Sequence, residues 1–201
     1  MRTLLLVLAM TFTFSATSRA SGNLALEGLE VLRRSFAGMR DFTADITQEK
    51  QISLMKQRMT AKGVVRFKKP GSFYMELYPP YASRLLLKDN VLEILLPAEG
   101  VHDRLVLPPE ESLERWFSYL ARPVTALPEG ADVRAERRDG EWTLHIFPRG
   151  KGGVRELQLA FEESGKLQRL TIEERNRDRT VIRFRNLRAN TGLSDRDFVL
   201  E

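Results

Sequence analysis

Apolar and polar residues alternate along most of the chain from residue 41 onward. At the start of this region Phe42, Ala44 and Ile46 alternate with Thr43 and Asp45. A period of two sends successive side chains to opposite faces, so the pattern predicts a half-buried β-strand. The same alternation, or a short apolar run, predicts further strands over residues 59–67, 73–77, 85–88, 91–96, 104–107, 133–137, 142–147, 157–161, 170–172 and 182–184.

Turn-forming residues separate these strands. Asp139-Gly140 is a strong hairpin signal, because a two-residue turn requires positive φ angles that glycine adopts without strain. Lys69-Pro70-Gly71, Asp89-Asn90 and Ser164-Gly165 divide other strands, and an arginine-rich turn at 175–179 precedes the last one. The pattern therefore predicts ten or eleven strands joined by turns.

Two segments have the period of a helix instead. In residues 24–39 the apolar positions recur at helical spacing, with Asn23 as a predicted N-cap and Gly38 as an end signal. Residues 109–122 form the second segment, opened by Pro108-Pro109 and ended by Pro123. The apolar faces are Leu29, Leu32 and Phe36 in the first helix, and Leu113, Trp116, Phe117 and Leu120 in the second.

Antiparallel strands in this number usually curl into one bent sheet or barrel. About eight strands enclose space for their own side chains, whereas ten or eleven leave room inside unless helices fill it. We therefore predict a mainly β fold with a few α-helices, in which a single highly curved antiparallel sheet forms an incomplete β-barrel of about 11 strands with helices covering its apolar cavity. The second helix either lies across the opening as a lid or completes a dry core, and the pattern alone favours neither.

The N-terminus has the layout of a secretory signal peptide. Met1-Arg2 is positive, residues 4–14 are almost wholly apolar, and Ser18-Arg19-Ala20 places small residues where a signal peptidase cleaves. The apolar run is shorter than the roughly 20 residues that a membrane-spanning helix needs, so a retained anchor is the weaker alternative. We predict a cleaved signal peptide at 1–20, a single domain at 21–201, and export to the periplasm. The chain contains no cysteine, so the fold relies on packing without disulfides.

The charge pattern and the reactive residues argue against nucleic-acid binding and catalysis. The net charge is +5, with basic and acidic residues interspersed along the strands, and the one local cluster at 175–179 fits a polar hairpin tip. His102 is predicted in a turn and His145 on the polar side of its strand, and neither has a histidine or cysteine at metal-ligand spacing. Nucleophile-elbow and phosphate-loop motifs are absent from the sequence. We predict no enzyme activity, no metal and no cofactor.

Several motifs occur together in an order that resembles one family. Residues 42–48, Phe-Thr-Ala-Asp-Ile-Thr-Gln, are similar to an opening strand of the form aromatic-x-Ala-x-apolar-x-Gln. Residues 63–73 combine a glycine, a strand, a basic-Pro turn and an aromatic residue. The likeness continues through Tyr78-Pro79-Pro80, Asp89, Pro97, Gly165-Lys166-Leu167, residues 180–186, Asn190 and Phe198. The chain thus resembles the LolA family of periplasmic carriers of outer-membrane lipoproteins.

The resemblance implies a monomeric carrier with no cofactor, no nucleotide and no covalent chemistry. Its cargo would be an acylated lipoprotein or lipid, received from an inner-membrane lipoprotein-releasing transporter and passed to an outer-membrane acceptor lipoprotein. Such a carrier is needed because exposing on the order of forty acyl methylenes to water costs ~30 kcal/mol.

The predicted site is the apolar side of the curved sheet. Its wall is predicted from the inward positions of the strands, its lid from the second helix, and its latch from the basic-Pro turn. The wall residues are Phe42, Ala44, Ile46, Val65, Phe67, Phe73, Met75, Leu77, Leu144, Ile146, Leu157, Leu159, Phe161, Leu170, Ile172, Ile182 and Phe184. The lid residues are Leu113, Trp116, Phe117 and Leu120, and the latch candidate is Lys69.

Two positions depart from the family pattern. Lys69 stands where members usually carry an arginine that hydrogen-bonds the lid backbone, and it lacks the planar fork of a guanidinium. Met75 stands where a tryptophan is common. These departures leave open two alternatives to a lipoprotein carrier, namely a related carrier of phospholipid or glycolipid and a periplasmic module that senses lipid or lipoprotein.

Overall fold

The computed structural model describes residues 17–107, 122–150 and 152–200. These residues form one α-helix, eleven strands and one short 3-10 helix. In chain order the elements are α1 (Thr17–Ala37), β1 (Asp41–Ile52), β2 (Gln57–Lys68), β3 (Ser72–Leu77), β4 (Ser83–Lys88), β5 (Val91–Leu96), β6 (Val101–Val106), β7 (Ala131–Arg138), β8 (Glu141–Pro148), β9 (Val154–Glu162), β10 (Leu167–Glu174), β11 (Arg179–Ala189) and η2 (Asp195–Asp197).

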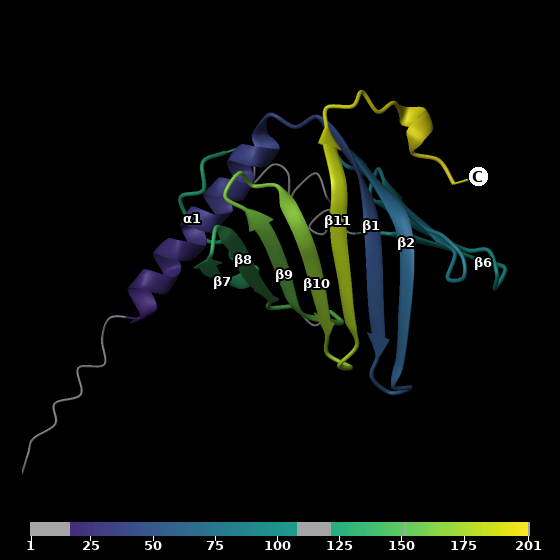
Figure 1. The fold of residues 1–201 in the computed structure, drawn as a ribbon, viewed down its shortest axis with the longest axis horizontal. Coiled ribbons are helices and arrows are strands. Elements are labelled where there is room, and N and C mark those ends of the chain that lie inside the picture. Colours follow the sequence, from purple (N-terminus) through teal and green to yellow (C-terminus); the bar gives the residue numbers. More distant parts are fainter. Residues whose placement is uncertain (1–16, 108–121, 151, 201) are drawn as a thin grey trace, which may run out of the picture.

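All eleven strands belong to one antiparallel sheet. Their order is β6-β5-β4-β3-β2-β1-β11-β10-β9-β8-β7, so two meanders meet where β1 pairs with β11. The sheet is strongly curved and open between its edge strands β6 and β7, and α1 lies across the β7 and β8 end (Figure 1). The predicted fold class, an incomplete barrel of about eleven strands, is therefore confirmed.

The strands form over the segments with alternating residues and over the short apolar runs, and one close backbone contact shapes the sheet between β2 and β3. Gly63 pairs with Leu77, and a Cβ atom at residue 63 would lie 1.9 Å from the carbonyl oxygen of Glu76. Only glycine lets β2 and β3 approach this closely. The close approach of these two strands thus explains why a glycine opens the predicted basic-Pro motif.

Two sequence predictions differ from the structure. The helix begins at Thr17 and not at an Asn23 cap, because extending a formed helix adds one hydrogen bond per residue and outweighs the capping preference of one side chain. His102 lies in β6 and not in a turn, since the strand begins at Val101 and pairs His102 with Leu95. The predicted signal residues 1–16 and most of the predicted helix at 109–122, with all four lid residues, lie outside the described residues.

Candidate functional site: the apolar concave face

Cross-strand register lines up apolar side chains on the concave face of β2 to β6. In one row Phe67 pairs with Phe73, Phe73 with Leu87, Leu87 with Leu92, and Leu92 with Leu105. Residues directly opposite each other in an antiparallel sheet point to the same side, so the row is continuous across five strands.

A second row, next to the first, ends on a carboxylate instead of an apolar side chain. Val65 pairs with Met75, Met75 with Leu85, Leu85 with Ile94, and Ile94 with Asp103. The side chains of Met75, Leu85 and Ile94 are half-buried, and Asp103 is exposed at the sheet edge. The apolar face therefore reaches water at β6 with one negative charge beside it.

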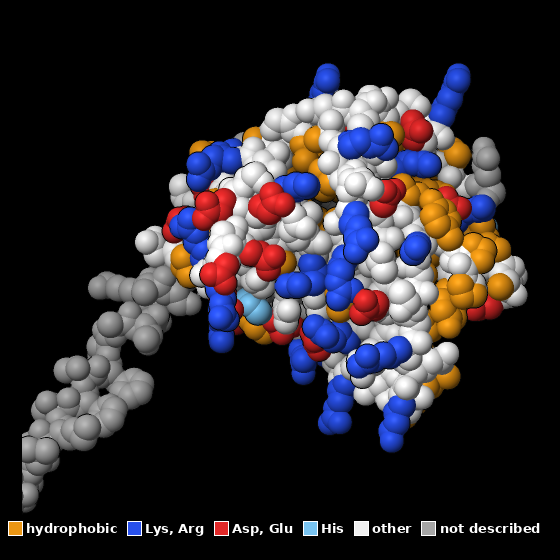
Figure 2. Space-filling view, viewed as in Figure 1, with side chains coloured by type: hydrophobic (Ala, Val, Ile, Leu, Met, Phe, Trp, Pro, Cys, Tyr) orange, Lys and Arg blue, Asp and Glu red, His pale blue; other side chains and the backbone are white. Residues whose placement is uncertain are grey.

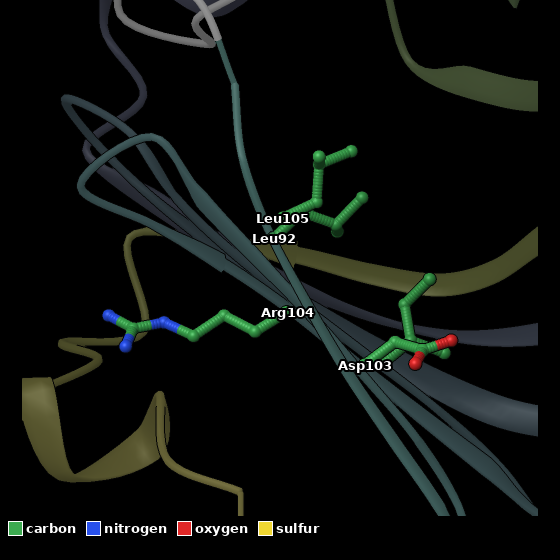
Figure 3. Close-up of a pocket in the computed structure, with 5 residues that line it drawn as sticks. Leu92, Asp103, Arg104 and Leu105 are labelled. Atoms are coloured by element: carbon green, nitrogen blue, oxygen red, sulfur yellow. The ribbon is translucent and has the colours of Figure 1, made fainter.

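A shallow pocket of about 330 Å³ lies at this edge. It is lined by Leu92, Ile94, Asp103, Arg104 and Leu105. Figure 3 shows Leu92, Leu105 and Asp103 on one side of the sheet, with Arg104 pointing to the other. The pocket is thus an apolar surface bordered by a carboxylate, and Leu105 within it is 57% exposed.

The other half of the concave face is covered by α1. Its residues Ala25, Leu29 and Leu32 pack against a buried cluster on β7 to β9 that includes Trp142 and Phe161. Gly28 permits this contact, because a Cβ there would already lie 3.0 Å from ring and methyl carbons of the sheet. Side chains in this half form a buried core.

The seventeen predicted wall residues fall on one face, but in different surroundings. Phe42, Ala44, Ile46, Val65, Phe67, Phe73, Met75, Leu77, Leu170, Ile182 and Phe184 gather in a central cluster. Leu144, Ile146, Leu157, Leu159 and Phe161 belong to the cluster beneath α1. Ile172 is half-buried and pairs with Leu157 and Thr180.

On the β4 to β6 part of this face, five residues were not predicted as part of the wall: Leu85, Leu87, Leu92, Ile94 and Leu105. The sequence marks them as apolar, but unbroken runs such as Leu85-Leu86-Leu87 do not show which residue points inward. Leu86 points outward, into a cluster with Tyr74 and Phe198. The C-terminal segment covers Leu86 there, so this residue is buried on the outer side of β4.

Lys69 lies at the rim where the β2–β3 turn meets the end of α1. Its Nζ donates to the carbonyl oxygen of Phe36 at 2.6 Å and to that of Ala37 at 3.5 Å. A cation is favoured at the carbonyl end of a helix. Burial lowers the pKa of the Lys69 ammonium below its ordinary value. The lysine thus contacts α1, and its role as a latch stays a prediction.

Asp41 fixes the junction between α1, β1 and the end of β11. Its buried carboxylate accepts hydrogen bonds from the Thr191 hydroxyl at 2.8 Å and from the backbone N–H groups of Thr191 and Gly192. Burial alone would raise the pKa of Asp41, but the hydrogen bonds outweigh it and hold the pKa below its usual range. Asn190 adds a bond from its side chain to the Gly38 carbonyl.

The histidines lie on the outer face, away from the concave one. His102 Nε2 is 3.1 Å from Glu93, and His145 Nδ1 is 2.7 Å from Glu156. Within the described residues no group of three or more metal-binding side chains converges. Charged side chains spread over the face of β11, β1 and β2 (Figure 2). Both histidines thus point away from the apolar rows of the concave face.

An open, curved antiparallel sheet with an apolar concave face and a helix across one half defines a fold class of incomplete barrels. The sequence profile of the family described as "Outer membrane lipoprotein carrier protein LolA" matches residues 37–201, and the chain belongs to this family. The match confirms the resemblance carried by the motifs. No helix among the described residues is long and apolar enough to span a membrane.

Individual relatives are distant. The chain is 24% identical over 176 residues to an outer-membrane lipoprotein carrier protein of Chromohalobacter salexigens, covering 87% of this chain and 82% of that protein. Among solved structures, an uncharacterized conserved protein of Thermus thermophilus matches with a TM-score of 0.52 and 11% identity, over 87% of this chain and 91% of the other. A DUF1329 family protein of Desulfovibrio piger matches with a TM-score of 0.50 and 14% identity, over 88% and 97%. The structural likenesses establish the fold alone.

Proposed function

We propose that this protein is a periplasmic carrier that shields lipoprotein acyl chains on its concave face and ferries them from the inner to the outer membrane. The observation that carries the proposal is the continuous apolar row from Phe67 to Leu105, which α1 leaves uncovered. Membership of the lipoprotein carrier family supports the choice of cargo.

The acyl chains would lie along the half of the face formed by β2 to β6. Phe73 and Met75 are half-buried there, and Leu105 is 57% exposed, so these side chains have surface left to bury. Each methylene removed from water contributes about 0.8 kcal/mol. A chain of fourteen to eighteen carbons could therefore bind to this face through burial of its methylenes alone, without any polar contact. The predicted lid, with Trp116, Phe117 and Leu120, would complete the shield.

The remaining parts of the proposal follow from the same role. Residues 1–20 would direct export and be removed, leaving 21–201 as one monomeric domain. An inner-membrane lipoprotein-releasing transporter would supply the cargo and an outer-membrane lipoprotein would accept it. The protein would transfer its cargo by binding and releasing it, with no catalytic step and no cofactor.

Neighbouring residues of β5 give a matched test. Ile94 points into the concave face and Leu95 to the outer face, and both are half-buried. We expect Ile94→Ser to weaken binding of a fluorescent acyl probe and its displacement by a triacylated peptide, by about tenfold. Leu95→Ser should leave both measurements unchanged. A folded parent protein that binds neither ligand would refute the proposal.

The cargo itself can be identified after capture from cells. The protein would be affinity-purified from the periplasm and its bound molecules extracted into organic solvent. Mass spectrometry of this extract would show acylated peptides if the protein carries lipoproteins. Recovery of phospholipid or glycolipid alone would assign the protein to a different branch of carriers.

A further inference from the structure

Two turns that are far apart in sequence form one projecting end of the sheet. The backbone N–H of Ser53, in the β1–β2 turn, donates to Asp178 Oδ1 in the β10–β11 turn at 2.8 Å. Because β2 pairs with β3 only from Gly63 onward, residues 57–62 extend this hairpin past the end of β3 by about 20 Å at ~3.4 Å per residue. Both turns lie at the lower end of the molecule in Figure 1. We name residues 50–58 and 175–179 the basic tip.

The basic tip has a net charge of +5, with six basic residues and one acidic residue. Without the predicted signal peptide 1–20, which contains Arg2 and Arg19, the rest of the chain has 24 basic and 26 acidic residues. The six are Lys50, Lys56, Arg58, Arg175, Arg177 and Arg179, and the acidic residue is Asp178. Lys and Arg side chains project from this end of the molecule in Figure 2. A nearly neutral body with one strongly basic end is steered tip-first toward an anionic surface.

Most of these cations have no acidic partner. Arg179 pairs with Glu173 at 2.9 Å, and Arg175 donates to the carbonyl oxygens of Gly150 and Gly152. Among the ion pairs of the described residues, none involves Lys50, Lys56, Arg58 or Arg177. These four can therefore neutralise anions from outside the protein.

Two apolar side chains stand at the apex of the same tip. Leu54 is 94% exposed and Met55 is 64% exposed, and Leu54 is the most exposed of the large hydrophobic residues that the structure describes. A single exposed leucine needs no explanation. An exposed apolar pair in the same tip as four cations without an ion pair is different, because this combination suits a surface that is anionic outside and apolar just beneath.

We propose that the basic tip docks on the surface of a bilayer containing anionic phospholipid. Leu54 and Met55 enter the headgroup region, and Lys56, Arg58 and Arg177 contact the phosphates. An acidic protein surface would use the cations but would gain little from a leucine at full exposure. The proposal goes beyond the carrier role and does not depend on the cargo, since the tip lies outside the apolar rows of β2 to β6.

Vesicle cosedimentation of the purified protein tests the proposal. We expect binding to phosphatidylcholine vesicles containing about 30 mol% phosphatidylglycerol, little binding to phosphatidylcholine alone, and loss of binding between about 0.05 and 0.5 M salt. The triple variant K56Q/R58Q/R177Q should bind roughly a hundredfold more weakly, at about fivefold for each charge removed. The variant L54S/M55S should bind at least about tenfold more weakly while keeping the salt dependence.

Two matched controls separate the tip from general charge and hydrophobicity. R138Q/R188Q/R196Q removes three exposed arginines elsewhere, and Val106→Ser removes an apolar side chain that is 70% exposed in β6. Both should bind anionic vesicles like the parent. Circular dichroism and acyl-probe binding should be unchanged in the tip variants, so a failed carrier role and a failed docking role give different results. Absence of binding to anionic vesicles, or equal binding by the parent and both tip variants, would overturn the proposal.

Discussion

Beneath α1, Leu144 and Phe161 are fully buried, whereas across the concave face at β6 Leu105 is 57% exposed. Both regions are built from apolar residues that point to the concave side of antiparallel strands. They differ in what covers them, because α1 packs against β7 to β9 and leaves the β4 to β6 side open. Apolar residues on the concave side thus form a stabilising core in one half and, in the other half, a surface that can bind an apolar ligand favourably.

One substitution in each half tests most directly whether the two halves differ in their contributions to stability and ligand binding. Leu144→Ala should lower the free energy of unfolding by about 2–5 kcal/mol, because it opens a cavity in a sealed core. Leu92→Ala, in a half-buried position, should cost less than about 1.5 kcal/mol yet weaken acyl-probe binding several-fold. Urea denaturation and probe titration of both variants provide the measurements. Equal stability losses would show that the two halves are one dry core.

A second prediction concerns the seam where β1 meets β11. Asp41→Ala should lower the free energy of unfolding at neutral pH by about 1.5–3 kcal/mol, because the hydrogen-bond donors of Thr191 and Gly192 lose a charged acceptor. Its pKa is lowered in the folded state, so the contribution is complete above the unfolded value of about 3.9 and is lost as pH falls through the folded value. Unfolding curves at several pH values should show the gap between parent and variant closing in acid.

Asp45 is the control for that experiment. It is an exposed carboxylate on the same strand and accepts one hydrogen bond from Asn186. Asp45→Ala should change stability by less than about 0.5 kcal/mol at any of these pH values. A gap between parent and Asp41→Ala that stayed constant from neutral to strongly acidic pH would contradict the assigned cause.

The smallest expected effect is at Lys69. Lys69→Leu should lower the free energy of unfolding by about 1 kcal/mol, because the Phe36 and Ala37 carbonyls lose their cation. Lys69→Arg should stay near the parent, and Lys62→Leu, at an exposed position of β2, is the control. Cargo uptake and release measured on the same variants test the latch. If parent, Leu and Arg variants behaved alike, Lys69 would be an ordinary surface residue.

The sequence predicted the strands well wherever one face is apolar and the other polar. Phe42, Ala44 and Ile46 alternate cleanly, and β1 places all three in the central cluster. Prediction failed where both faces are apolar, as at Leu86, because the outward contact with Phe198 depends on a segment more than a hundred residues away. The pairing of β1 with β11 and the contact of Lys69 with Phe36 are likewise tertiary and leave no local signal.

The position of β11 has a consequence for how the molecule is made. Its pairing with β1 joins the two meanders, and it is the last strand of the sheet in chain order. Until it is in place, β1 and β10 each present an unpaired edge at the centre of the sheet, a template for joining another chain. Contacts between residues so distant in sequence also form slowly. A chain cut short before β11 would therefore be prone to aggregate, and any factor that holds the nascent chain unfolded until residue 189 is available would favour correct assembly.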